Sequence, residues 1–267
     1  MYLGRALLFC PADRPERYEK ALATADVVIL DLEDAVAPDN KATARNALIA
    51  TPIDPLRVIV RVNAPGTPYY EADVEALGKT AYTQVMLAKT ESSAQVEALA
   101  PLTVVALLET AKGILAAPEI VGAANLGAVM WGAEDLMVSL GGRRSRFADG
   151  TYRTVAQHAR ASSLLATAAA GLPSIDAVYL DINDLEGLGA ESLDAAESGF
   201  QAKACIHPKQ VEVVRNAYAP SADQVAWAKR VVAADTGGVF SLDGMMVDGP
   251  VLGQARQILR DAGELDA

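Results

Sequence analysis

Short apolar runs recur along the chain, and most of them end in a charged side chain or an acid–base residue. In the clearest run, residues 27–34 (Val-Val-Ile-Leu-Asp-Leu-Glu-Asp), three acids crowd the end of what the pattern predicts to be a fully buried strand. Seven runs end in this way, and an eighth ends in Cys10 and Pro11. Because buried charge is costly unless it is paired or metal-bound, the repetition predicts one polar site at one end of the strands.

Segments with helical periodicity alternate with these runs, which gives eight strand–helix units in series. This order favours an α/β fold of the (β/α)8 TIM-barrel type over an open doubly wound sheet. No Gly-x-Gly-x-x-Gly follows the first run, which weakens a dinucleotide-binding interpretation. In such barrels the site lies at the C-terminal ends of the strands, where the polar residues fall here. The predicted strands are residues 7–10, 27–32, 58–62, 85–88, 104–108, 128–131, 177–182 and 203–206.

The chain continues past the eighth unit, so we predict a barrel over residues 1–218 and a C-terminal tail over residues 219–267. In the tail, Gly237 and Gly238 separate a helix that starts near Ser221 from a final helix that ends near Ala262. We expect this helical tail to pack on its own barrel or on that of a neighbouring chain. No linker rich in Pro, Gly or Ser divides the chain into independent domains.

Length and composition agree with a barrel and exclude some classes of protein. The 267 residues lie near the roughly 250 of a typical eight-stranded barrel. The net charge of −11 argues against a broad basic surface for nucleic acid. No apolar run reaches the roughly 20 residues of a membrane span, and no signal-peptide pattern opens the chain. We therefore expect a cytoplasmic protein in which Cys10 and Cys205 are reduced core thiols.

Glu109 and Asp135 end the fifth and sixth predicted strands, which are neighbours in a barrel. Two carboxylates with waters suit Mg²⁺, whereas a helix N-cap for Asp135 and an ion pair for Glu109 are the purely structural alternatives. His158 and His207 are the only histidines, and neither belongs to a Cys/His cluster, so a zinc site is not expected.

Two basic residues end neighbouring strands. Arg61 ends the third, where its guanidinium could grip a carboxylate in bidentate fashion or form an ion pair with Asp31, Glu33 or Asp34. Lys89 ends the fourth strand, and an ion pair is favoured there over a Schiff base.

Other basic residues gather near the start of the chain and could cradle phosphates at the barrel mouth, although a solvated helix face explains them equally well. They are Arg14, Arg17, Lys20, Lys41 and Arg45.

The chain resembles the citrate lyase β-subunit-like branch of the HpcH/HpaI aldolase family from residue 5 to about residue 262. The matching segments are residues 7–17 (Leu-Leu-Phe-Cys-Pro-Ala-Asp-Arg-Pro-Glu-Arg), 31–36 (Asp-Leu-Glu-Asp-Ala-Val), 60–63 (Val-Arg-Val-Asn), 108–110 (Leu-Glu-Thr), 132–136 (Gly-Ala-Glu-Asp-Leu), 205–208 (Cys-Ile-His-Pro) and 246–248 (Met-Val-Asp). The resemblance implies a (β/α)8 barrel, a homotrimer or hexamer, Mg²⁺, and carbon–carbon bond chemistry beside a CoA thioester.

The resemblance also implies roles for individual residues. Glu109 and Asp135 match the metal ligands. Arg61, supported by Glu33, matches the group that binds the keto-acid carboxylate and polarises the reacting carbonyl, and Asp248 matches an acid–base aspartate of the tail. The remaining roles are a substrate contact at Gly132, Ala133 and Asp135, and a CoA site at Arg14, Arg17, Lys41, Ile206, His207 and Pro208.

These roles predict a Mg²⁺-dependent lyase that acts on a 3-hydroxyacyl-CoA of the citramalyl, malyl, citryl or 3-hydroxy-3-methylglutaryl type. The partners expected are a small acyl-CoA and a keto acid, with no nucleic acid and no membrane. Two alternatives stay open. One is a malyl-CoA thioesterase or a malate-synthase-like enzyme on the same site, and the other is a carrier-dependent citrate lyase β subunit that is inactive alone.

Overall fold

The computed structural model describes residue 1 and residues 3–265, and its contacts divide the chain into two compact units. The first is Met1–Arg215 and the second is Asn216–Ala267. The predicted boundary at residue 218 lies three residues further on, inside helix α10. How the tail packs stays a prediction.

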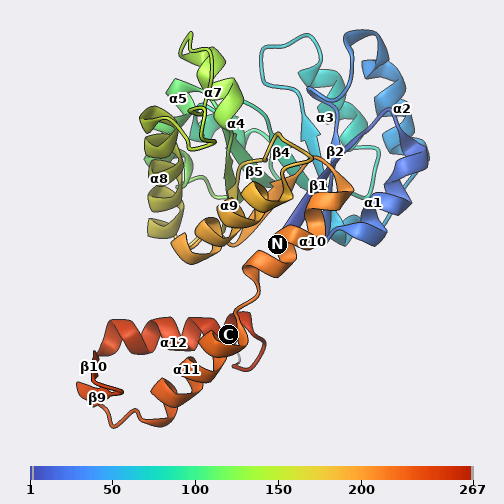
Figure 1. Cartoon of the computed structure of the whole chain (residues 1–267). Helices are drawn as coiled ribbons and strands as arrows, with labels where there is room; N and C mark the ends of the chain where they lie inside the picture. Colours follow the sequence, from blue (N-terminus) through green and yellow to red (C-terminus); the bar gives the residue numbers. More distant parts are fainter. Residues whose placement is uncertain (2, 266–267) are drawn as a thin grey trace. The chain divides into compact units, whose positions relative to one another are not determined.

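The first unit is a closed barrel of eight parallel strands in sequence order, which confirms the predicted fold (Figure 1). Hydrogen bonding between β1 and β8 completes the ring, with Leu8 opposite Cys205. Closure leaves no strand edge unpaired. The strands are β1 (Ala6–Pro11), β2 (Val27–Asp31), β3 (Val58–Val62), β4 (Gln84–Leu87), β5 (Thr103–Leu108), β6 (Leu126–Trp131), β7 (Ser174–Asp176) and β8 (Ala202–Cys205).

The pleat of the strands decides which side chains face the barrel axis. Ile29, Ile59 and Leu107 belong to one buried cluster inside the barrel. Because side chains alternate between faces, the residue two positions later on each chain points the same way. Those residues are Asp31, Arg61 and Glu109. The barrel interior is therefore apolar at its centre and charged at the end where the strands finish.

Helices connect the strands and cover the outside of the barrel (Figure 1). Two short helices connect β5 to β6, because Pro118 stands in the first turn of the second one and cannot continue the first. The helices are α1 (Tyr18–Thr24), α2 (Lys41–Ala50), α3 (Tyr70–Leu77), α4 (Ser93–Glu97), α5 (Ala111–Leu115), α6 (Ala117–Ile120), α7 (Ala133–Ser139), α8 (Thr154–Ala169), α9 (Leu185–Ser198) and α10 (Pro208–Tyr218).

The predicted seventh strand over residues 177–182 is wrong. The seventh strand is β7, three residues earlier, which pairs with β6 through Ser174 and with β8 through Asp176. Its only apolar residue, Ile175, faces the interior cluster, while Asp176 is buried outside it among ion pairs. The apolar run that follows lies in an irregular segment, where Leu180 is half exposed.

The second unit builds its own small core. Helices α11 (Ala222–Ala233) and α12 (Gly249–Asp261) pack through Ala228, Val231, Ala255 and Leu259. Between them lies a two-stranded antiparallel hairpin, β9 (Phe240–Leu242) and β10 (Met245–Val247). A capping box begins α11 at Ser221, as expected for the start of the tail helix.

Both cysteines are buried free thiols, as predicted. Burial raises the pKa of Cys10 to about 11 and that of Cys205 to about 12, so neither is a thiolate at neutral pH. Within the described residues, no helix is long and apolar enough to cross a membrane.

Candidate functional site

Arg61 is anchored at the mouth of the barrel by two carboxylates. Asp31 lies opposite it in the β2–β3 register and accepts hydrogen bonds from Nε at 2.7 Å and from Nη2 at 2.6 Å. Glu33 Oε2 lies 2.9 Å from Nη1. Burial alone would lower the pKa of Arg61, but the charge of Asp31 raises it, so the guanidinium stays charged. Of its five N–H groups these contacts use three, which leaves two for a ligand.

Glu109 directly follows β5, whereas Asp135 does not end β6 as predicted but lies in the first turn of α7. The two carboxyl groups still come together beside Lys89. Glu109 is almost fully buried, whereas the side chain of Asp135 is 30% exposed. Burial and the nearby charge of Asp135 raise the pKa of Glu109 to about 8.

The ammonium of Lys89 stands among these carboxylates. Its Nζ lies 3.3 Å from Asp135 Oδ1, 3.9 Å from Glu109 Oε1 and 2.5 Å from Glu33 Oε1. The predicted ion pair of Lys89 is therefore confirmed. Burial would lower the pKa of Lys89, but the hydrogen bond to Glu33 and the charge of Glu109 raise it. A protonated lysine of this kind is a poor Schiff-base nucleophile.

Gly132 gives Glu109 the room it occupies. A Cβ atom on Gly132 would lie 2.9 Å from both Cβ and Oε2 of Glu109, which is closer than such atoms approach in proteins. The glycine follows β6 directly and precedes Ala133, so the turn into α7 passes close beside the buried carboxylate.

A cavity of about 400 Å³ opens at this end of the barrel. Arg61, Glu109 and Asp135 line it together with Gly132 and Ala133, so one hollow holds the predicted substrate-binding residues. Phe9, Val178 and Ile206 add apolar wall, and the guanidinium of Arg61 lies over the Phe9 ring at 4.8 Å. The cavity can therefore take a small anion beside an apolar chain.

Comparison with known proteins places the chain in a family. A family model described as HpcH/HpaI aldolase/citrate lyase matches residues 5–208. The chain belongs to this family. The citrate lyase subunit beta-like protein of Mycobacterium tuberculosis is 57% identical over 263 residues, which cover 98% of this chain and 96% of that protein. The (3S)-malyl-CoA thioesterase of Cereibacter sphaeroides is 35% identical and covers 98% of this chain and 96% of its own length.

Solved structures of family members carry ligands. The crystal structure of CitE from Mycobacterium tuberculosis in complex with magnesium, acetoacetate and coenzyme A is 57% identical, has a TM-score of 0.95, and covers 97% of this chain and 98% of its own. The structure of a citrate lyase beta subunit of the same organism, complexed with oxaloacetate and magnesium, is 58% identical with a TM-score of 0.80. The match covers 81% of this chain and 97% of that one.

In this member of the family, the residues predicted to form the CoA site lie in different environments. Arg14 and Arg17 precede α1 and are largely exposed, and their contacts to the neighbouring acids Asp13 and Glu16 are long, at 3.7 and 3.9 Å. Lys41 is buried, and its ammonium donates to the carbonyls of Leu32 and Glu33 and to Asn63 Oδ1. These acceptors use all three of its protons. Lys41 therefore holds the turn after β2 in this structure, and a phosphate contact would require it to move.

The β8–α10 connection presents the other predicted CoA residues. Ile206 is 38% exposed and lines the cavity, while His207 and Pro208 follow it at the start of α10. The side chain of Gln210 accepts hydrogen bonds from the backbone N–H groups of Ile206 and His207. This fixes the loop at the rim of the site.

Asp248 belongs to the second unit, where it is the N-cap of α12 and accepts a hydrogen bond from Val251 N at 3.2 Å. Its predicted acid–base role stays a prediction.

A second cluster of charges lies outside the barrel wall, and the apolar pattern did not reveal it. Lys203 of β8 is fully buried and donates to Asp176 Oδ2 at 2.8 Å, to Glu191 Oε1 at 2.9 Å and to the Ala177 carbonyl. Arg160 contacts Asp176 from α8. We call these residues, with Arg146, the outer network. Its signal in the sequence is a Lys and an Asp inside short strands, at positions that face away from the core cluster.

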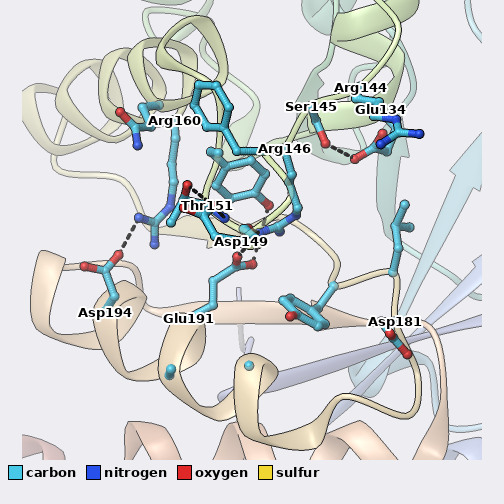
Figure 2. Close-up of a pocket in the computed structure, with 18 of the residues that line it drawn as sticks. Glu134, Arg144, Ser145, Arg146, Asp149, Thr151, Arg160, Asp181, Glu191 and Asp194 are labelled. Atoms are coloured by element: carbon cyan, nitrogen blue, oxygen red, sulfur yellow. Dashed lines mark hydrogen bonds and ion pairs between the residues drawn. The ribbon is translucent and has the colours of Figure 1, made fainter.

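A cavity of about 990 Å³ adjoins the outer network (Figure 2). Arg146 and Glu191 meet at 2.6 Å on one side of it, and Arg160 and Asp194 at 2.5 Å on another. Glu134 and Leu180 line both this cavity and the one at the barrel mouth, so the two hollows are neighbours.

The donors at the mouth fit a hard cation with few protein ligands. Within the described residues, no group of three or more His, Cys, Asp or Glu side chains is arranged to hold a metal. A pair of carboxylates suffices for Mg²⁺, which keeps several waters. The ammonium of Lys89 beside Glu109 and Asp135 demonstrates that a positive charge is accommodated there.

Proposed function

We propose that this chain is a Mg²⁺-dependent carbon–carbon lyase that cleaves a 3-hydroxyacyl-CoA with a terminal carboxylate into acetyl-CoA and a keto acid. One observation carries the proposal. A buried arginine with two unused N–H groups shares a cavity with a pair of carboxylates and an apolar wall. That set matches a substrate with an anionic end, a metal-chelating centre and a thioester chain.

The family relatives support the substrate class. Their structures hold oxaloacetate, acetoacetate and pyruvate together with magnesium, and one also holds coenzyme A. Each of these acids is what remains when a citryl-, 3-hydroxy-3-methylglutaryl- or citramalyl-CoA loses acetyl-CoA. A metal held by Glu109 and Asp135 would act as a Lewis acid toward the oxygen at C3.

The remaining chemistry falls to side chains of this protein. The C3 hydroxyl would pass its proton to a carboxylate of the cavity wall such as Asp34. The C3 oxygen then forms the carbonyl of the keto acid, the C2–C3 bond breaks, and its electron pair moves to C2 as the acetyl-CoA enolate. Arg61 donates its two free N–H groups to the developing negative charge, and Asp31 and Glu33 hold it in place without reorganisation. Asp248, from this chain or a neighbouring one, would return the proton to C2.

The CoA part of the substrate would run from Ile206 at the cavity rim toward Arg14 and Arg17. The two arginines are exposed, and their ion pairs with neighbouring acids are long, at 3.7 and 3.9 Å, so they can contact phosphates. His207 and Pro208 would form the wall beside the pantetheine chain, and Gly132 and Ala133 would contact the acid part.

A thioesterase is the second candidate, because a relative that covers nearly the whole chain is named as one. The same contacts would hold the substrate, but water would attack the thioester carbon. A carrier-dependent β subunit is the third, because a citrate lyase subunit beta from Leuconostoc mesenteroides is 30% identical over 97% of this chain.

Product analysis separates these candidates. Purified protein with Mg²⁺ is given citramalyl-, malyl-, citryl- and 3-hydroxy-3-methylglutaryl-CoA in both C3 configurations. We expect acetyl-CoA and the keto acid to appear in equal amounts. Free CoA with the intact hydroxy acid would instead establish the thioesterase, and no turnover of any CoA ester would favour the carrier-dependent subunit.

Matched variants assign the site. Asp135→Ala should reduce Mg²⁺-dependent turnover by about a thousandfold. Asp149→Ala serves as the control and should leave turnover unchanged, because Asp149 is an exposed acid that lines the larger cavity and not the one at the barrel mouth. Full activity of Asp135→Ala would remove the assignment of the metal ligands.

A further inference from the structure

Lys89 reaches three carboxylates of the site through both its backbone and its side chain. Its backbone N–H donates to Glu109 Oε1 at 3.0 Å. Its ammonium contacts Glu33 and Asp135. One residue thus bridges the carboxylate that supports Arg61 and both carboxylates that the proposed function assigns to the metal.

The backbone of Lys89 adopts a conformation that lysine rarely takes. Its φ is 51°, in the left-handed region, and it is one of two non-glycine residues with positive φ in the described chain. Such a conformation costs about 1–3 kcal/mol and persists only where the surroundings impose it. Strain of this kind is common at functional sites and invites a functional explanation.

The next residue imposes that conformation. Thr90 is fully buried, its N–H donates to the Leu107 carbonyl, and its hydroxyl donates to the Leu87 carbonyl. A Cβ on Gly113 of α5 would come within 2.3 Å of the Thr90 carbonyl oxygen, so this turn is also packed against a helix that accepts no side chain there. The turn is therefore fixed, and it aims Lys89 at the carboxylates.

We propose that Lys89 is a built-in counter-cation of the metal site. In the metal-free protein its ammonium contacts the carboxyl groups of both Glu109 and Asp135 and keeps them together. A divalent cation on those two ligands would stand next to a like charge, so Lys89 would give up both contacts and keep Glu33 alone. Lys89 is thus a positioning residue that competes with the metal for the two carboxylates. Once the metal is bound, Lys89 remains paired with Glu33. This inference rests on the proposed metal ligands.

The position of Glu33 makes that exchange feasible. Its two oxygens face different cations, with Oε2 toward Arg61 and Oε1 toward Lys89. The Lys89 contact to Glu33 is also shorter than the contacts to Glu109 and Asp135. Loss of the two longer contacts therefore leaves the ammonium paired.

Mg²⁺ affinity in the absence of substrate tests the inference. Calorimetric titration of Lys89→Met with Mg²⁺ should give a dissociation constant on the order of tenfold lower than that of the wild type, because a competing unit charge is removed. Lys89→Arg keeps the charge and should bind Mg²⁺ like the wild type. Lys112→Met removes a lysine that lies three residues after Glu109 and pairs with Glu91, and it should change the affinity less than about twofold because its side chain is 72% exposed.

Thermal unfolding gives a readout that a purely structural role would not move. Lys89→Met should melt at a lower temperature than the wild type in EDTA, yet saturating Mg²⁺ should raise its Tm by more than it raises that of the wild type. Lys89→Gln provides the same test if the methionine variant folds poorly. Equal or weaker Mg²⁺ binding by both variants would overturn the inference. If Asp135→Asn still binds Mg²⁺ as the wild type does, the metal ligands of the proposed function are wrong instead.

Discussion

Lys89 and Lys203 occupy similar chemical surroundings on opposite faces of the same barrel wall. Each ammonium faces at least two carboxylates. Lys203 is fully buried and its three acceptors satisfy all its protons. Lys89 keeps 31% of its side chain exposed, lies on a strained turn and has two longer contacts, at 3.3 and 3.9 Å. The ammonium of Lys203 therefore has all its acceptors, whereas the carboxylates around Lys89 have room for another cation.

The pleat explains why one wall carries both. Ala202 and Ala204 fill the interior cluster, so Lys203 between them faces the helices. The mouth cluster, which we define as Asp31, Glu33, Arg61, Lys89, Glu109 and Asp135, lies at the open end. Charges sealed behind helices stabilise the fold, whereas charges that line a cavity remain available for chemistry.

Lys203→Met should have the largest effect on stability. It removes the fully buried partner of Asp176 and Glu191, which keep only the less buried Arg160 and Arg146 as cations. The loss of one member of a buried ion pair costs about 3–5 kcal/mol. The Tm should fall by about 10 °C, measured by circular dichroism. Turnover per folded molecule below that temperature should stay close to the wild type, because no outer-network residue lines the mouth cavity with Arg61.

Lys79→Met is the matched control for this prediction. Lys79 forms an exposed ion pair with Glu75, so its loss should leave the Tm close to that of the wild type. If Lys203→Met unfolds at the same temperature as Lys79→Met, the outer network contributes nothing to stability and the contrast between the two lysines fails.

Trp131→Phe tests whether the two regions are linked. The indole N–H of Trp131 donates to Asp176 Oδ1 at 2.7 Å, and the next residue is Gly132 at the mouth. Loss of a hydrogen bond to a buried carboxylate should lower the free energy of unfolding by about 2 kcal/mol. Urea denaturation measures this, and Trp227→Phe in the second unit is the control for the same substitution. If Trp131→Phe lost as much Mg²⁺ affinity as Asp135→Ala does, the outer network and the mouth cluster would be one functional site and not two separate regions.

The barrel and the mouth cluster were predictable because their signals are periodic. A run of core residues followed by a charge on the same face marks Asp31, Arg61 and Glu109 without any other information. The predicted ion pairing of Arg61 and Lys89 followed from their places on neighbouring strands. These side chains share one end of the barrel because parallel strands all end there.

The outer network was missed because burial outside the barrel leaves no apolar run. Asp176 has no apolar run around it, so the seventh strand was predicted three residues too late, and Lys203 was predicted within the eighth strand but without its partners. Lys41 was predicted either to contact phosphates or to lie on a solvated helix face, but in the structure its ammonium is buried against three acceptors. Long-range partners of this kind depend on the closed fold, which local sequence patterns do not encode.

The two regions should also respond to pH in opposite directions. Burial would raise the pKa of Asp176, but Lys203 and Arg160 lower it, so its stabilising contribution is present at neutral pH and is lost as pH falls through the lowered value. Glu109 has a raised pKa of about 8, so its protonated form is favoured in the fold. Its contribution is full below the ordinary value near 4.5 and is lost as pH rises toward 8.

The raised pKa of Glu109 can be measured through the pH dependence of Mg²⁺ binding at the barrel mouth. A carboxylate must lose its proton to bind a metal, so Mg²⁺ affinity should fall about tenfold for each pH unit below 8 and level off above it. In EDTA the Tm should decline between pH 6 and 8 by this contribution, and saturating Mg²⁺ should offset the decline. Glu109→Gln, which cannot titrate, should remove the decline and bind Mg²⁺ weakly at every pH. A Mg²⁺ affinity that is independent of pH over this range would mean that the buried carboxylate is already ionised, and that Lys89 neutralises it more completely than the contrast with Lys203 implies.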